Sequence, residues 1–533
     1  MMRWTVEKIK GLFGKKTLYF ICILAFNYVE FLRATGNGDV WKMAANCTGF
    51  VMMVIIFSNY EIKSFFNIIN YIYTAVCIMA MVAVYFHWKQ HMGEYYLGQV
   101  ETAIMNIWWI GLMLRHLFRQ VFITKQMTVR IGIIGWLWVI MVAWCVLGKS
   151  GMLWPLWFFL MFGMFYMTKF SKTDWETLTN ALINGTICSF FAIQGYAYLF
   201  RPYDRVRYMG AYTNCNAMAL YFVIVYVFIL IKLHQLHMNK AKAGWKLFYF
   251  IGAGGLLSFQ FLTVCRTAWM TSGIVTIVFG YWVLRNHWGE SWRKILMKGC
   301  LLALCAILTF LPVFYSVRYI PTIHPHPIWH MDDEYGMSRI HSWDPADSEK
   351  YIELDEFLEV ALGRISSLFR VVSVNMPFTL KAHAQEEITY VDNTSTSGMD
   401  SSIKVRFELW KAYLKETTLL GHPAGSENFA WKSNGKYIWH AQNVWVQFTY
   451  TYGLPVGILF AVVTTMLLFT TYKKGKVCEN VYGIIPFMLC LSFFLFGTAE
   501  VVWNPGQYIL TLFFFGLHPQ FLQDNETRII ANK

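Results

Sequence analysis

Three side chains with chemical capability stand beside apolar segments in the second half of the sequence. Arg266 lies between two apolar runs with almost no polar residues around it. A guanidinium group next to lipid costs free energy unless a partner or an anionic ligand offsets its burial. Arg406 and Trp410 are four residues apart, which places them on one face of a helix, and His440 opens the next apolar run. The pattern predicts a site for an anionic ligand close to the membrane surface.

A second basic stretch contains Arg201, Arg205 and Arg207, and it is followed by Asn214 and Asn216 at the start of another apolar run. Under the topology derived below, this stretch lies on the outer side of the membrane, where positive charge is uncommon. Two interpretations stay open. Either the arginines contact lipid headgroups with their long side chains, or they contribute to binding an anionic ligand.

The composition defines the solvent that surrounds these residues. The chain has 533 residues, of which 56% are hydrophobic and only 14% are charged, with a mean hydropathy of +0.41. Soluble domains carry about 25% charged residues, so this chain is predicted to lie in a lipid bilayer. Its formal charge of +14 comes in short clusters between apolar runs, which indicates membrane topology and no nucleic-acid partner. The 11 cysteines form no Cys-x-x-Cys pair, so neither a disulfide framework nor a zinc site is expected.

Apolar runs long enough to cross a bilayer recur along the whole chain. A spanning helix needs about 17–25 such residues, and the sequence predicts about 12–14 spanning helices. The first run is predicted to be an uncleaved span, because no small-residue cleavage site follows it. The predicted runs cover residues 17–33, 41–58, 65–86, 101–119, 130–148, 151–168, 177–200, 214–232, 246–264, 267–285, 295–316, 442–471, 481–499 and 505–520.

Clusters of lysine and arginine occupy most of the alternate connections, and short basic loops stay in the cytoplasm. This pattern predicts that both termini are cytoplasmic. The expected fold class is an all-α polytopic integral membrane protein with a large helical extracytoplasmic loop. Its expected parts are an N-terminal transmembrane bundle (1–200), transmembrane helices with outer basic motifs (201–316), the extracytoplasmic loop domain (317–441) and C-terminal transmembrane helices (442–533).

The long outer loop is predicted to contain two helices. Apolar residues at i, i+3 and i+4 spacing predict an amphipathic helix over 348–374, and a second helix is expected over 401–417. A Gly-His-Pro-Ala-Gly stretch at 421–425 then ends the helix, and residues 439–443 lead the chain back to the membrane. One loop thus brings an arginine and a histidine to the bilayer surface.

These motifs, in this order and on the outer side of the membrane, resemble those of the bacterial O-antigen ligase and O-antigen polymerase superfamily. The resemblance covers roughly residues 200–520 and implies a GT-C-like membrane fold. The motifs are Gly210-Ala-Tyr-Thr-Asn214-Cys-Asn216, Cys265-Arg266-Thr-Ala-Trp269, Arg406-Phe-Glu-Leu-Trp410, Gly421-His-Pro-Ala-Gly425, His440-Ala-Gln-Asn443 and Tyr452-Gly453-Leu-Pro-Val-Gly457.

The resemblance implies that a glycan is transferred or polymerised from undecaprenyl diphosphate onto a glycan, lipid or cell-wall acceptor. The reaction would take place at the outer face of the bacterial cytoplasmic membrane, in the biosynthesis of lipopolysaccharide or capsule. The resemblance assigns the diphosphate to Arg266 and Arg406, because guanidinium groups bind phosphate oxygens bidentately. It assigns the acceptor hydroxyl to His440, as base or orienter.

No cofactor and no metal ion are expected, because arginines can stabilise the charge of the leaving diphosphate. The sequence departs from the family pattern at Gln442, where a second histidine is usual, and at Pro423, where glycine is common. The choice between ligase and polymerase therefore stays open. Further residues implied in substrate binding are Arg201, Arg205, Arg207, Asn214, Asn216, Trp410, His422 and Asn443.

Three alternatives are a metal site in the outer loop, a lipid-linked oligosaccharide flippase and a proton-coupled transporter. A His/Asp/Glu-rich string at 324–334 has donors for a divalent metal ion, but solvated loops produce such strings freely. A lipid-linked oligosaccharide flippase would have a similar number of spans, yet it gives no reason for the long outer loop. Glu30 and Glu500 lie near the ends of spans, so the intramembrane acids typical of a proton-coupled transporter are not indicated.

The predicted topology can be tested by cysteine labelling in intact cells. Cysteines introduced at Ser342 or Thr394 should react with a membrane-impermeant maleimide, because both positions belong to the predicted outer loop. Cysteines at Lys240 or Lys474 should stay unlabelled until the membrane is permeabilised. Labelling at Lys240 in intact cells would contradict the predicted orientation.

Overall fold

The computed structural model describes residues 14–35, 65–91, 94–125, 128–129, 131–150, 168–169, 172–198, 203–204, 207–210, 215–286, 291–320, 354–373, 403–423, 432–433, 436–437, 440–477 and 481–501. Helices dominate this part of the chain. They are α2 (Lys15–Thr35), α4 (Ile68–His91), α5 (Glu94–Phe118), α6 (Ile133–Leu147), α8 (Lys172–Ala197), α9 (Cys215–Met238), α10 (Ala243–Leu262), α11 (Arg266–Asn286), α12 (Trp292–Tyr319), α13 (Leu354–Ser373), α14 (Ile403–Lys415), α15 (Val444–Tyr452), α16 (Leu454–Val477) and α17 (Ile485–Gly497).

Short elements connect some of these helices. A π-helical turn, Arg119–Ile123, continues α5, and a 3₁₀ turn, Val481–Ile484, precedes α17. The described strands form short antiparallel pairs, which are β1 (Thr128–Val129) with β2 (Thr168–Lys169), β3 (Tyr203–Asp204) with β4 (Arg207–Tyr208), and β5 (Lys432–Ser433) with β6 (Lys436–Tyr437).

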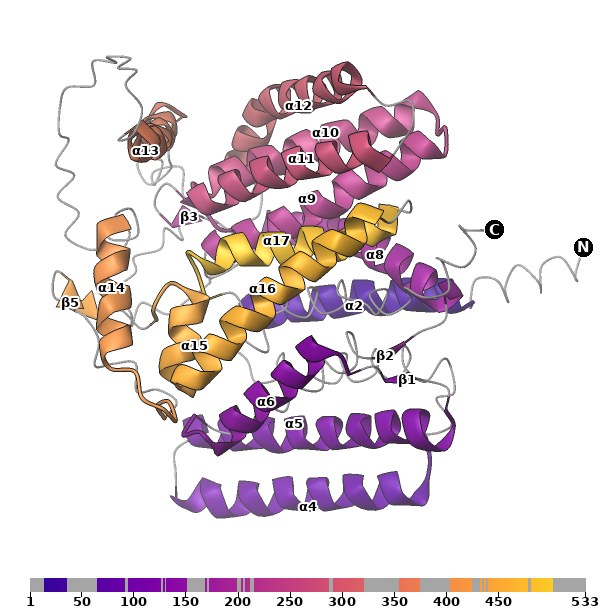
Figure 1. The fold of residues 1–533 in the computed structure, drawn as a ribbon, viewed down its shortest axis with the longest axis vertical. Coiled ribbons are helices and arrows are strands. Elements are labelled where there is room, and N and C mark those ends of the chain that lie inside the picture. Colours follow the sequence, from indigo (N-terminus) through magenta and orange to yellow (C-terminus); the bar gives the residue numbers. More distant parts are fainter. Residues whose placement is uncertain are drawn as a thin grey trace, which may run out of the picture.

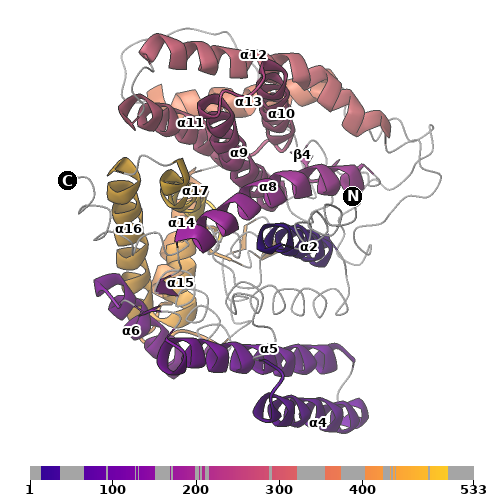
Figure 2. The same ribbon diagram turned by 90° about the vertical axis from the view of Figure 1, so that its right-hand side faces the viewer.

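Helix α9 is the centre of the bundle. It contacts α8, α10, α11 and α17, and Figures 1 and 2 show it enclosed by these helices. Its side chains are apolar around the whole helix, and Tyr221, Phe222 and Phe228 are fully buried. A helix that is apolar on every face is stable inside a bundle or in lipid. The core of the protein is therefore built around α9.

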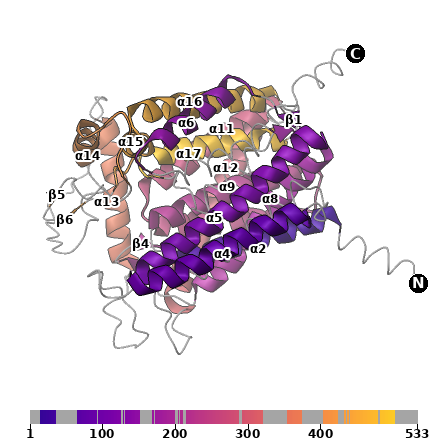
Figure 3. The same ribbon diagram turned by 90° about the horizontal axis from the view of Figure 1, so that it is seen from below.

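Helix α4 lies at the edge of the molecule (Figures 1 and 2), and it packs along α5 (Figure 3). It exposes large apolar side chains, including those of Ile72, Met79 and Phe86. Soluble proteins rarely expose apolar surface in such a continuous area. Lipid is the solvent that suits this face of α4.

Within the described residues, five helices are long and apolar enough to cross a membrane. They are α4 over Ile68–His87, α9, α11, α12, and α16 over Leu454–Lys476. This confirms a mostly helical protein whose apolar helices have membrane-spanning length. The predicted spans 41–58, 151–168 and 505–520 lie outside the described residues, and the total of about 12–14 spans stays a prediction.

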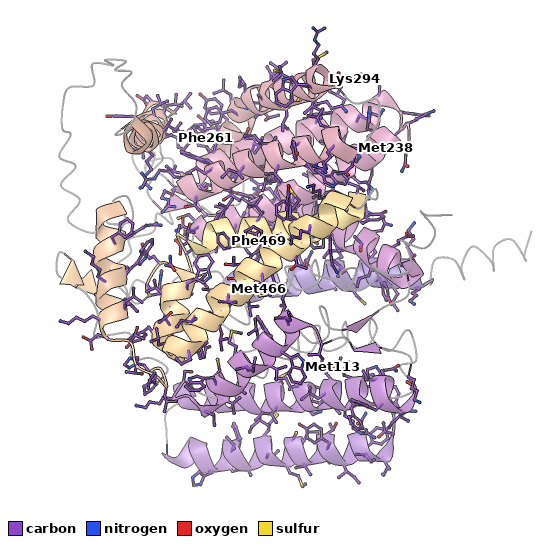
Figure 4. The ribbon with its side chains drawn as sticks, in the orientation of Figure 1. Met113, Met238, Phe261, Lys294, Met466 and Phe469 are labelled. Atoms are coloured by element: carbon purple, nitrogen blue, oxygen red, sulfur yellow. The ribbon has the colours of Figure 1, made fainter. Side chains whose placement is uncertain are left out.

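Lysines gather at one end of the bundle, and the helices of the long loop lie at the other end. Met238 ends α9 and Lys294 lies in the first turn of α12, and both are found at one end of the bundle in Figure 4. Lysines at 240, 242 and 246 lie in or next to the α9–α10 connection at that end. The helices α13, α14 and α15 lie at the opposite end (Figure 1). This separation agrees with the expected sidedness of the protein, which stays a prediction.

Both helices predicted within 317–441 are present, as α13 and α14. Phe357 and Ala361 form the buried face of α13. The Phe357 ring lies 5.6–6.0 Å from the rings of Phe261, Phe310 and Phe314, and Figure 4 shows Phe261 beside α13. The apolar face of α13 therefore covers α10 and α12, as expected for an amphipathic helix.

The prediction of one continuous span over 442–471 is wrong. The chain forms α15 and α16 instead, separated at Gly453, where φ is +101°. The N–H of Leu454 donates to the carbonyl oxygen of Thr418 at 3.0 Å, and a side chain at Gly453 would overlap the carbonyl group of Leu419. Because the apolar composition continues across the break, the interruption depends on this contact with the end of the loop.

Gly453→Ala is expected to lower the melting temperature of the detergent-purified protein by several degrees. Alanine disfavours a positive φ, and its Cβ would displace the Leu419 carbonyl. Gly255→Ala in α10 is the matched control, because no atom lies within 4 Å of a Cβ built there. Alanine is the better helix former by about 1 kcal/mol, so this control should keep or raise the melting temperature. An unchanged value for Gly453→Ala would contradict the close backbone contact.

Candidate functional site

The C-terminal end of α17 accepts hydrogen bonds from two distant parts of the chain. Nη1 of Arg406, on α14, donates to the carbonyl oxygen of Ala499 at 3.2 Å. Nδ2 of Asn443, the N-cap of α15, donates to the carbonyl oxygen of Thr498 at 3.4 Å. Thr498 is the C-cap of α17 and Ala499 is the next residue, so both carbonyl groups lie at the end that the helix dipole makes negative. Here the Arg406 guanidinium and the Asn443 amide donate hydrogen bonds to these carbonyl groups. We call residues 498–500 the α17 terminus.

Glu500, the third residue of the α17 terminus, takes part through its side chain. Its Oε1 accepts a hydrogen bond from Nδ2 of Asn216, on α9. Oδ1 of Asn216 accepts in turn from Nη2 of Arg207 at 2.6 Å, and Nε of Arg207 donates to the carbonyl oxygen of Thr263 at 3.1 Å. A continuous chain of hydrogen bonds thus joins β4, α9 and the α10–α11 turn to α17. Because an amide has distinct donor and acceptor atoms, these bonds fix the orientation of Asn216.

The buried position of Arg207 helps to decide between the two interpretations of the basic stretch, which are contact with lipid headgroups and binding of an anionic ligand. The side chain is 8% exposed, and its hydrogen bonds go to protein groups. Contact with lipid headgroups is therefore not its role in this structure. Arg201, Arg205 and Asn214 lie outside the described residues, so their roles stay predictions.

Arg266 begins α11 directly after a strained turn. In this turn Val264 is completely buried and has a φ of +49°, a conformation that β-branched residues rarely adopt. The thiol of the next residue, Cys265, is close enough to Glu500 and Arg406 to interact with them electrostatically. Arg266 follows this cysteine as the first residue of α11, and its side chain is half-buried.

One turn after Arg406, α14 is attached to the residues that precede α15. Nε1 of Trp410 donates to the carbonyl oxygen of Ala441 at 3.0 Å. The N–H of Ala441 donates to Oε1 of Gln447 at 2.8 Å, which fixes this segment to α15. The face predicted to carry Arg406 and Trp410 is thus the face that meets the α17 terminus and the start of α15.

One ring nitrogen of His440 accepts a hydrogen bond from the backbone. The N–H of Gln442 donates to Nδ1 of His440 at 3.2 Å, and Gln442 has a left-handed φ of +50°. A ring nitrogen that accepts a hydrogen bond carries no proton, so the proton of the neutral imidazole is on Nε2. Nε2 is then the hydrogen-bond donor of the ring. Of the two expected roles, this geometry favours the orienter over the base.

His422 contributes to the packing of α14 on α15. Its ring stacks on Tyr450 with 4.2 Å between the centroids, and its Nε2 lies 2.7 Å from the carbonyl oxygen of Glu416. Tyr413 packs edge-on against the same tyrosine at 5.1 Å. None of the contacts described for His422 reaches the α17 terminus. Substrate binding by this residue stays a prediction without support from its surroundings.

Metal binding has no support in the described part of the chain. No group of three or more His, Cys, Asp or Glu side chains is placed there to hold a metal ion. The His/Asp/Glu-rich string at 324–334 lies outside the described residues.

Glu500 is the residue of this cluster that sequence reasoning missed. From its position in the sequence, Glu500 is only an acid near the end of a span, with no assigned role. A signal was present, because Glu500 is the one acidic residue between Glu479 and Asp524, and a carboxylate in an apolar stretch needs a partner or a function. Its partner could not be predicted, because Asn216 is 284 positions away in the sequence.

The α17 terminus therefore gathers guanidinium, amide and carboxylate groups at one end of the bundle, and the imidazole of His440 lies on the segment that Trp410 holds nearby. Such a set of groups can bind an anion and transfer a proton. No protein-family model matches the sequence, and no curated protein matches it.

Proposed function

We propose that this protein is an O-antigen ligase-like membrane glycosyltransferase. It transfers or polymerises a glycan from undecaprenyl diphosphate at the outer face of the bacterial cytoplasmic membrane, and the acceptor is a hydroxyl group of a glycan, a lipid or the cell wall. The reaction belongs to the biosynthesis of a surface polysaccharide of the cell envelope. It uses no metal ion and no cofactor.

One observation carries the proposal. Arg406, Asn443 and Asn216 come from three separate motifs of the resemblance, and each donates a hydrogen bond to the α17 terminus. If each motif only stabilised its own helix, the three motifs would not be expected to contact the same short segment. Their convergence supports a common site at the end of the bundle that carries α13 and α14.

Arg406 suits the binding of a diphosphate. A guanidinium group has five N–H donors, and the hydrogen bond described for Arg406 uses one of them, on the carbonyl group of Ala499. This bond holds the planar group, and the other donors can fork onto phosphate oxygens. Arg266 begins α11 directly after Cys265 and, in this proposal, supplies the second guanidinium group. Arg207 is buried and holds Asn216.

His440 suits the orientation of the acceptor. With its proton on Nε2, the imidazole donates a hydrogen bond to a lone pair of the acceptor oxygen. The hydroxyl hydrogen then points away from the ring. This arrangement holds the nucleophilic oxygen while another group takes its proton.

The proposal is tested by incubating purified protein with a lipid-diphosphate glycan and candidate acceptors in EDTA and measuring the gain in acceptor mass. Arg406→Ala should reduce transfer by about 10- to 150-fold, because a charge-assisted hydrogen bond contributes about 1.5–3 kcal/mol. Arg406→Lys should also fail, because an ammonium group cannot form the bidentate fork. Lys411→Ala removes an exposed cation from the same helix and should transfer at the wild-type rate.

Two outcomes of this assay would contradict the proposal. Movement of the lipid-linked glycan across the bilayer without transfer to any acceptor would identify a flippase. Loss of transfer in EDTA with recovery on addition of magnesium or manganese would move the site to the acidic string at 324–334.

The role of His440 has its own test. His440→Ala should reduce turnover by about 10²-fold, the usual effect of removing one positioned hydrogen-bond donor, and should leave donor binding intact. His440→Gln should recover part of the activity, because its amide N–H can replace the Nε2 donor. If the glutamine variant is as inactive as the alanine variant, His440 is the base and the proton assignment is wrong. Transfer at the wild-type rate by His440→Ala would exclude both roles.

A further inference from the structure

Transfer to a hydroxyl acceptor needs a group that takes up the hydroxyl proton. In the described geometry Nδ1 of His440 accepts a backbone hydrogen bond, so its lone pair is engaged and Nε2 is left as the donor of the ring. Among the described residues joined by hydrogen bonds at the α17 terminus, Glu500 supplies the carboxylate. A carboxylate is a suitable proton acceptor for a hydroxyl group that is being consumed in bond formation.

The position of Glu500 suits this role. Its Oε1 accepts from Asn216, which Arg207 holds in a fixed orientation. The residue before it, Ala499, accepts the hydrogen bond of Arg406 through its carbonyl group. The half-buried carboxylate is therefore one residue from the point where the proposed diphosphate-binding guanidinium is attached.

Resting on the glycosyltransferase function proposed above, we infer that Glu500 is the general base of the reaction. The acceptor oxygen forms a bond to the anomeric carbon of the donor sugar while the bond from that carbon to the diphosphate oxygen breaks. The electron pair of the broken bond leaves with the diphosphate. The proton of the acceptor hydroxyl moves to the carboxylate of Glu500, which becomes neutral.

Proton uptake by Glu500 is coupled to the charge of the leaving diphosphate. The nearby guanidinium groups by themselves favour the ionised carboxylate, so the stabilisation of the transition state arises at the leaving group. The guanidinium groups of Arg207 and Arg406 both lie within electrostatic range of the Cys265 thiol, as Glu500 does, and Arg266 follows that cysteine. When the glycosidic bond breaks, the diphosphate gains one negative charge. When Glu500 takes up the proton, the site loses one negative charge. The net positive charge of the site thus rises as the leaving group becomes more negative, which stabilises the transition state in a poorly solvated site.

A role in positioning alone is the alternative, because Oε1 of Glu500 also holds Asn216. Glu500→Gln separates the two roles. Glutamine keeps the length of the side chain and an oxygen that accepts from Asn216, but it does not take up a proton at neutral pH. Asn216→Ala is the complementary variant, because it removes this hydrogen bond and keeps the carboxylate.

The experiment measures glycan transfer, binding of the lipid-diphosphate glycan and melting temperature for purified full-length protein. We expect Glu500→Gln to lose about 10²-fold or more in turnover, with unchanged donor affinity and melting temperature. Asn216→Ala should lose less turnover than Glu500→Gln. Glu416→Gln, which neutralises an exposed acid at the end of α14, should transfer at the wild-type rate.

Wild-type turnover by Glu500→Gln would overturn the base role, and so would a loss confined to donor affinity. If the glutamine variant does not fold, Glu500→Ala is assayed with added formate. Recovery of transfer by this external carboxylate supports a missing base, and absence of recovery overturns it. A wild-type protein that transfers glycan to no acceptor removes the proposed function together with the base role, so the two failures are distinguishable.

Discussion

The carbonyl groups at the end of α17 are the constraint on which the candidate site depends. Thr498 is the C-cap of α17 and Ala499 follows it, so their carbonyl groups have no partner inside the helix, and leaving such groups unpaired away from water is costly. The carbonyl oxygens of Thr498 and Ala499 accept from Asn443 and Arg406, and these two donors belong to α15 and α14. The need to satisfy one helix end thereby attaches two other helices to it. Because the attached guanidinium group also meets the negative end of the helix dipole, the contact favours a cation at this place.

The segment that follows α14 is held by close contact with the backbone between α15 and α16. Gly421 and Gly453 face each other so closely that a side chain on either would overlap the opposite backbone. On the far side, Nε1 of Trp144 on α6 donates to the carbonyl oxygen of Leu419 at 3.0 Å. Tyr413 lies along α14 between Arg406 and this segment, and it belongs to the buried cluster that α14 shares with α15. With both ends held, α14 has little freedom to change the distance between Arg406 and the membrane helices, which is the condition for a preorganised binding group.

Residue types and spacing were sufficient to predict most of the described helices but not their contacts. Long apolar runs predicted α9, α11 and α12, and the i, i+4 spacing of Arg406 and Trp410 predicted a shared face on α14. The break at Gly453 was not predictable, because it depends on a loop carbonyl more than 30 positions earlier in the sequence. The sequence leaves Arg207 between headgroup contact and anion binding, and in the structure it is buried, with Asn216 and the Thr263 carbonyl accepting its hydrogen bonds. Pairings between distant polar residues leave no trace in local hydropathy.

Backbone strain beside two candidate residues shows how packing determines the geometry of the site. Val264 and Gln442 have positive φ values and lie two residues from Arg266 and His440, respectively. Such conformations cost about 1–3 kcal/mol each and persist only when the surroundings enforce them. For Val264 the surroundings are complete burial and the bond from Arg207 to the preceding carbonyl group, and for Gln442 they include its own N–H bond to the imidazole. Relaxing either residue to its preferred backbone would redirect the chain at the neighbouring guanidinium or imidazole, so the packing around these two turns determines where Arg266 and His440 lie.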